Sequence, residues 1–140
     1  MLVPDVNVVL AALRRDHPQF APARRCIDQA RSGPRPLGIA DIVASSVLRL
    51  ATTDRVFREP STTEQVVGFL DALLDPPAVL LAAGATHWAT FSRLCREAGV
   101  RGNDVPDAHL AALTIAQGAE LVTFDRGFAR YPGLRWRAPA

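Results

Sequence analysis

Short apolar segments alternate with helical patterns along this chain, and no other feature limits its fold as much. The apolar segments "LVP", "PLGIA", "AVLLAA" and "AELVTF" predict four strands, and "LRW" would add a short edge strand. The residues between them have apolar side chains at helical spacing. Because strands and helices alternate, we expect an α/β fold with a mainly parallel sheet of four to five strands, flanked by helices, in a single domain over residues 1–140.

Local signals predict the ends of these helices. Asp41 is of a residue type that caps helices, and it precedes the helical segment "IVASSVLRLATT". Ser61 or Thr62, followed by Glu64 or Gln65, predicts a capping box at the next helix. Helix-breaking residues predict where the helices end: Ser32-Gly33-Pro34, Pro76-Pro77, Gly99 and Gly118.

The charge pattern is compatible with an anionic partner. The formal net charge is +2, and all basic residues other than histidine are arginines, a bias that a GC-rich genome also produces. Arginine forms bidentate contacts with phosphate. The arginines gather in the N-terminal third and at the C-terminus: Arg14, Arg15, Arg24, Arg25, Arg31, Arg35, Arg126, Arg130, Arg135 and Arg137.

No apolar segment is long enough to cross a bilayer, and the first residues do not resemble a secretory leader. Cys26 and Cys95 lie in helical patterns without the spacing of a metal site. We therefore expect a cytoplasmic protein with reduced thiols and no membrane partner.

Two acidic residues directly follow segments that should be buried strands. Asp5 comes after "MLVP", and Asp125 comes after "LVTF". In open parallel sheets, ligands bind beyond the carboxyl ends of the strands. We therefore expect both carboxylates at the ligand-binding edge of the sheet.

A third acid reaches the same edge from a helix. Asp104 is a plausible N-cap of the helix in "DVPDAHLAALTIAQG", and Asp107 then lies in its first turn. Capping explains Asp104 well but Asp107 less well, because one acid already fills the cap. The small side chains that follow Asp107 would let the helix pack closely on the sheet and direct this carboxylate towards Asp5 and Asp125.

Three converging carboxylates repel one another, and a hard divalent cation would relieve that repulsion. Mg²⁺ prefers oxygen ligands and retains waters, one of which can be activated to hydrolyse a phosphodiester. A purely structural set of acids remains the alternative at this point.

Five segments, in order and at family-like spacing, resemble a known family: "PDVNVVLAAL", "HPQFAPA", "RLATTDRVFREPST", "GNDVPDAHLAAL" and "LVTFDRGFARYPGLRW". Over essentially the whole chain they resemble VapC toxins of VapBC toxin–antitoxin pairs, which are PIN-domain ribonucleases, and most closely a subgroup abundant in mycobacteria. The resemblance implies cleavage of RNA, often tRNA or rRNA, by an endonuclease that depends on Mg²⁺ or Mn²⁺. It also implies a cognate VapB antitoxin and a homodimer.

The family's acidic positions fall on Asp5, Asp107 and Asp125, which the resemblance makes the catalytic and metal-binding residues. Its accompanying polar positions fall on Asn7 and Thr123. Each of these two also has an ordinary structural interpretation, Asn7 as a cap where the first helix opens and Thr123 as a strand residue.

One position departs from the family pattern. PIN domains commonly carry a glutamate on the helix after the second strand, where this chain has Ser46. Three explanations remain open: Asp104 or another acid substitutes for the glutamate, three acids hold one metal ion, or the activity is weakened. The last leads to an alternative function, a PIN domain that binds RNA or an antitoxin without cleaving RNA.

The remaining polar residues carry weaker predictions. Arg49 and Arg126 are candidates for contacts with RNA phosphates, although each also fits a solvated surface arginine. We expect no catalytic role for His17, His87 or His109, because a metal-bound water needs no histidine base. A phosphoacceptor receiver domain would carry paired acids early and a lysine late, and this chain has neither.

Overall fold

A computed structural model describes residues 1–140, and every strand pairing in it is parallel. Strands β1 (Leu2–Pro4), β4 (Glu120–Val122) and β5 (Arg135–Arg137) form one sheet in the order β1-β4-β5. Strands β2 (Gly38–Ala40) and β3 (Val79–Leu81) form a second. A parallel bridge between Leu2 and Leu37 joins the two, so the strands follow the order β3-β2-β1-β4-β5. The predicted parallel sheet of four to five strands is confirmed.

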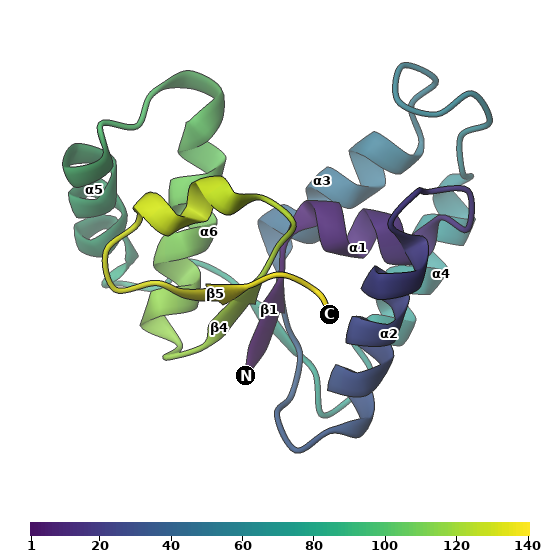
Figure 1. The fold of residues 1–140 in the computed structure, drawn as a ribbon, viewed down its shortest axis with the longest axis horizontal. Coiled ribbons are helices and arrows are strands. Elements are labelled where there is room, and N and C mark those ends of the chain that lie inside the picture. Colours follow the sequence, from purple (N-terminus) through teal and green to yellow (C-terminus); the bar gives the residue numbers. More distant parts are fainter.

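Six α-helices cover these strands: α1 (Val6–Leu13), α2 (Phe20–Ser32), α3 (Asp41–Ala51), α4 (Thr63–Leu73), α5 (His87–Ala98) and α6 (Val105–Ala116). Two short 3₁₀ helices, η1 (Gly102–Asp104) and η2 (Arg126–Arg130), precede α6 and follow β4. Figure 1 shows α1, α2, α3 and α4 gathered on one side of β1, and α5 and α6 on the other. None of the helices is long and apolar enough to span a membrane.

Most predicted helix signals act as expected. The Thr62 side chain accepts a hydrogen bond from the Gln65 amide and the Gln65 side chain accepts one from the Thr62 amide, so these two residues form the capping box of α4. Gly99 ends α5 in the left-handed region, at φ +62°, which glycine adopts without strain. The prediction that Asp41 caps α3 is wrong by one residue. Strand β2 continues directly into the helix, so Ala40 occupies the N-cap and the Asp41 carboxylate accepts from the Ile42 amide within the first turn.

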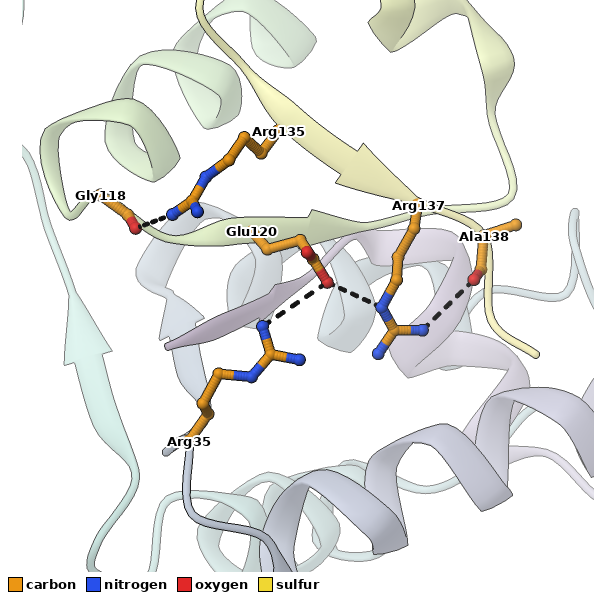
Figure 2. A network of polar contacts seen from close by, with 6 residues as sticks. All are labelled: Arg35, Gly118, Glu120, Arg135, Arg137 and Ala138. Atoms are coloured by element: carbon orange, nitrogen blue, oxygen red, sulfur yellow. Dashed lines mark hydrogen bonds and ion pairs between the residues drawn. The ribbon is translucent and has the colours of Figure 1, made fainter.

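A polar network ties the start of β4 to its neighbours (Figure 2). The Glu120 carboxylate at the start of β4 pairs with Arg137 Nε at 2.7 Å and with Arg35 Nη1 at 3.8 Å. Arg135 donates to the Gly118 carbonyl oxygen. These three arginines therefore connect β4 to β5 and to the segment before β2. The charge pattern had placed them among the residues that could contact an anionic partner.

Candidate active site

Asp5 lies where β1 ends and α1 begins, and its carboxylate is oriented by two hydrogen bonds. Oδ1 accepts from the Val6 amide at 2.7 Å, which makes Asp5 the N-cap of α1, and Oδ2 accepts from the Thr123 hydroxyl at 2.7 Å. The residue is only 6% exposed. Burial raises its pKa, the two hydrogen bonds oppose that rise, and the nearby Asp125 charge adds to it.

Thr123 connects the ends of β1 and β4 through one buried hydroxyl. Besides donating to Asp5, the hydroxyl accepts from Asn7 Nδ2 at 3.2 Å and from the Asp125 amide at 3.0 Å. Asn7 Oδ1 in turn accepts from the Phe124 amide at 3.2 Å. Asn7 therefore does not cap α1, because Asp5 holds that place, and its side chain instead ties α1 to the end of β4.

Asp125 follows β4 and is exposed to solvent. Its Oδ1 accepts from the Gly127 amide at 2.7 Å and so begins η2. This hydrogen bond fixes one carboxylate oxygen and leaves the other without a partner in the protein.

Asp107 lies in the first turn of α6, as predicted, and its half-buried carboxylate makes no hydrogen bond within the protein. Its pKa is raised to about 6, first by burial and then by the negative charges of Asp5, Asp125 and Asp104, while Arg130 opposes the rise. Carboxylates from β1, α6 and the end of β4 are thus close enough to repel one another.

Asp104 occupies the N-cap position of α6, as predicted, but its side chain accepts no capping hydrogen bond. Helix η1 runs directly into α6, and Asp104 itself has helical backbone angles (φ −87°, ψ −9°), whereas a capping side chain requires an extended residue. Asp104 is exposed, and its Oδ2 lies 3.6 Å from Arg130 Nη1.

Ser46 lies on α3 beside two of the acids. A small cavity of about 50 Å³ is lined by Asp5, Val6, Ile42, Val43, Ser46, Pro106, Asp107 and Leu110. The Ser46 hydroxyl has no hydrogen-bond partner in the protein. The structure therefore places a hydroxyl, and no fourth carboxylate, on the α3 side of this cavity.

The donor set fits a hydrated divalent cation. No three His, Cys, Asp or Glu side chains lie close enough together in this structure to hold a metal ion directly. Mg²⁺, however, keeps several waters and is bound in proteins through a few carboxylates rather than a closed cage. The unpartnered Asp107 carboxylate, with a pKa raised by burial and by three neighbouring acids, is the group that a cation would stabilise most.

Sequence reasoning missed Arg130 and Tyr131 beside this site. Arg130 Nη2 donates to the Tyr131 hydroxyl at 3.1 Å, and its guanidinium lies over the Tyr131 ring, 5.1 Å from the centroid. The only signal was the place of Arg130 in the C-terminal group of arginines. Arg49, in the last turn of α3, and Arg126, next to Asp125, are exposed and make no ion pair.

The histidines take up other positions. The His17 ring accepts from the Gln19 amide at the entry to α2. His87 is buried against Phe91 and His109, with ring centroids 5.5 Å and 4.2 Å away. None of them hydrogen-bonds to Asp5, Asp107 or Asp125.

Comparisons with known proteins agree on one family. The PIN domain profile matches residues 2–134. A VapC ribonuclease of Mycobacterium bovis is 40% identical over 140 residues, covering 99% of this chain and 95% of the relative. Ribonuclease VapC31 of Mycobacterium tuberculosis is 36% identical, covering 99% of each chain.

Two solved structures share the fold. The first is Mycobacterium tuberculosis VapC20, described as a toxin that cleaves the sarcin-ricin loop; it has a TM-score of 0.71 and 16% sequence identity, and the match covers 96% of this chain and 99% of the other. The second is VapBC2 of Rickettsia felis bound to promoter DNA; it has a TM-score of 0.70 and 22% sequence identity, and the match covers 98% of this chain and 97% of the other.

Proposed function

Since the chain belongs to the PIN-domain family of VapC ribonucleases, we propose that it is the toxin of a type II toxin–antitoxin pair and cleaves RNA as an endonuclease that requires Mg²⁺ or Mn²⁺. Residues 1–140 form its single PIN domain. Asp5, Asp107 and Asp125 are the proposed metal ligands and catalytic residues. The observation that carries this assignment is the unpartnered Asp107 carboxylate, whose pKa is raised to about 6 by burial and by the charges of the other acids.

When bound, the cation would supply an activated water and neutralise charge that develops on the phosphate. The protein's own contribution is orientation. The Thr123 hydroxyl and the Val6 amide hold both Asp5 oxygens, so this carboxylate cannot rotate away from the site. The Gly127 amide holds one Asp125 oxygen in the same way. Asp107, free of internal hydrogen bonds, keeps both oxygens available.

Ser46 and Asp104 take secondary places in this proposal. Ser46 lines the same cavity as Asp5 and Asp107, where its hydroxyl can hold a water but adds no negative charge. Asp104 is exposed and paired with Arg130, which argues against its replacing the usual glutamate. We therefore favour three carboxylates around the ion.

Ser46 also motivates the second candidate function, a PIN domain that binds RNA or an antitoxin but cleaves poorly. Ser46→Glu separates the two. A large gain in cleavage supports the weakened site, whereas little change means that three carboxylates suffice.

The proposed partners are RNA, a cognate VapB-type antitoxin and a second copy of the chain in a homodimer, in the cytoplasm. An antitoxin arginine could pair with the acids and exclude the cation. An upstream reading frame that encodes a small DNA-binding protein would support this part of the proposal.

The test is cleavage of cellular RNA by the purified protein with Mg²⁺, with Mn²⁺ and with EDTA. We expect cleavage only with a metal ion, and a loss of about a hundredfold in rate for Asp5→Asn and Asp107→Asn, because mutating even the outer-shell partners of a metal site costs about 10–100-fold. Equal cleavage in EDTA, or by the two variants, would reject the assignment.

A further inference from the structure

One cationic side chain, that of Arg130, forms an ion pair with an acid of the site. Its Nη1 lies 3.6 Å from Asp104 Oδ2, whereas the other ion pairs of the chain join residues outside the site. The Arg130 charge also reaches Asp107, where it opposes the rise in pKa that burial and the neighbouring acids cause. Arg130 ends η2, and the Asp125 carboxylate begins the same helix. This short helix therefore has a proposed metal ligand at its start and a guanidinium at its end.

Tyr131 holds this guanidinium from the side of the core. The tyrosine is 3% exposed, and its ring packs against the buried Phe128 ring, 5.8 Å away between centroids. Its hydroxyl accepts from Arg130 Nη2 at 3.1 Å, and the guanidinium lies over its ring. Because a packed core side chain has little freedom to move, Tyr131 confines the part-exposed guanidinium to one position beside the acids.

Most of the hydrogen-bonding capacity of Arg130 is unused. A guanidinium carries a fork of N–H donors, and the bond to the Tyr131 hydroxyl is the only hydrogen bond that this one makes within the protein. The contact with Asp104 is an ion pair between two side chains that are 36% and 56% exposed, and pairs of this kind contribute little to stability. An incoming anion can therefore replace Asp104 at little cost.

The charges at the site favour a phosphate group as that anion. Three carboxylates around one divalent cation leave a negative charge in excess, and a phosphodiester adds another. A fixed positive charge beside the metal site offsets this repulsion and stabilises the charge that develops on the phosphate during hydrolysis. Arginine suits this role because its planar fork of N–H groups matches the geometry of phosphate oxygens.

We propose that Arg130, held in place by Tyr131, binds the phosphate group of the RNA at the acidic site, and that Asp104 is its counterion when RNA is absent. The inference rests on the proposed ribonuclease function and adds a substrate-binding residue to it. It also gives Asp104 a role other than holding the cation. On RNA binding, the phosphate takes the place of Asp104 beside Nη1, while the hydrogen bond from Nη2 to Tyr131 remains.

The salt dependence of RNA binding tests the phosphate contact without relying on cleavage. A fluorescein-labelled single-stranded oligoribonucleotide is titrated in EDTA over a range of salt concentrations, and binding is followed by anisotropy. One phosphate contact contributes about 0.7 to the slope of log affinity against log salt concentration for a single strand. Arg130→Gln should therefore flatten that slope by about 0.7, and it should weaken binding at low salt about tenfold.

Two further variants control this measurement. Arg130→Lys keeps the positive charge and should keep the slope. Arg93→Gln removes a part-exposed arginine that pairs with Glu97 on α5, and it should change neither the slope nor the affinity. A slope that Arg130→Gln leaves unchanged, or that Arg93→Gln flattens equally, would overturn the proposal.

Asp104→Asn tests the exchange of the counterion. Without the competing carboxylate, Arg130 is free to bind phosphate, so the oligoribonucleotide should bind about threefold more tightly. In the Arg130→Gln background the same substitution should have little effect, because Asp104 acts through Arg130. Equal tightening in both backgrounds would show that Asp104 acts only through its own negative charge, and would contradict the exchange.

Metal binding and cleavage separate a substrate contact from a purely structural role. Arg130→Gln removes a positive charge near Asp107, so it should tighten Mn²⁺ binding in calorimetric titration. The same variant should lower kcat/KM for RNA cleavage at saturating Mn²⁺ about a hundredfold. A side chain that only supported the fold would weaken both, and weaker Mn²⁺ binding by Arg130→Gln would therefore refute the assignment.

The nuclease function and the role of Arg130 can fail separately. If Arg130→Gln flattens the salt slope and couples to Asp104, but the wild type never cleaves RNA with Mg²⁺ or Mn²⁺, then Arg130 binds phosphate and the nuclease proposal is wrong. If the wild type cleaves with a metal ion, and Arg130→Gln retains both the slope and the cleavage rate, then only the role of Arg130 is wrong.

Discussion

Replacing Asp107 with asparagine should stabilise the metal-free protein at neutral pH. A rise in the pKa of Asp107 from 3.8 to about 6 corresponds to about 3 kcal/mol between its two protonation states. The carboxylate is only half-buried, so solvent screening reduces this figure, and we take about half of it, ~1.5 kcal/mol. Asparagine has nearly the shape of the carboxylic acid and carries no charge. For a domain of this size the gain corresponds to an increase in Tm of about 5 °C.

The pH dependence of this gain follows from the direction of the shift. The folded protein binds the Asp107 proton more tightly than the unfolded chain does, so the destabilisation by Asp107 is absent below pH 3.8. It grows as the pH rises from about 4 to about 6 and is fully present above that range. The stabilising effect of Asp107→Asn should therefore be fully present at pH 7.5 and clearly smaller at pH 4.5.

Thermal unfolding in EDTA, at both pH values, measures this difference. Asp54→Asn, at an exposed loop position without a side-chain partner, is the matched control and should leave the Tm unchanged at either pH. Adding Mg²⁺ should raise the Tm of the wild type and not that of Asp107→Asn, because only the wild type binds the ion at this site. A lower or unchanged Tm for Asp107→Asn at pH 7.5 in EDTA would refute the electrostatic reasoning, as would an equal gain at pH 4.5.

Three other substitutions test the surrounding structure. Thr123→Val removes the hydroxyl shared by Asp5, Asn7 and the Asp125 amide. It should lower the free energy of unfolding, measured by chemical denaturation, by about 2–3 kcal/mol and slow RNA cleavage more than tenfold. Thr123→Ser keeps the hydroxyl and should retain most of the stability and most of the cleavage rate. Thr62→Ala breaks the capping box of α4 and should lower stability by about 1 kcal/mol without altering cleavage. Ser46→Glu should change the rate of cleavage less than threefold if three carboxylates suffice, and a rate increase of tenfold or more would contradict that view.

The fold could be predicted in large part from the sequence because its signals are local. Apolar segments, glycines in the left-handed region such as Gly99, and the Thr62 capping box act within a few residues of their position. The errors arose at junctions. Asp41 lies one residue inside α3, because strand β2 runs directly into this helix and Ala40 takes the N-cap position. Asp104 does take the N-cap position of α6 but makes no capping hydrogen bond, because the 3₁₀ helix η1 runs directly into α6.

The arrangement of the acidic site could be predicted only in part. The positions of Asp5 and Asp125 after strands, and of Asp107 in the first turn of α6, follow from the pattern of the sequence, and their role as metal ligands remains a prediction. The bonds that orient them do not follow from it, since Thr123 reaches Asp5 across 118 residues. The pairing of Arg130 with Asp104 likewise depends on how η2 packs beside α6.

The central claim is that Asp5, Asp107 and Asp125 together hold the divalent cation that RNA cleavage requires. The most direct test is calorimetric titration of Mn²⁺ into the wild type and into Asp107→Asn, with RNA cleavage measured over the same Mn²⁺ concentrations. The account predicts that wild-type cleavage rises in parallel with Mn²⁺ binding and that Asp107→Asn loses both. Cleavage that proceeds without metal, or Asp107→Asn that binds Mn²⁺ as tightly as the wild type, would contradict it.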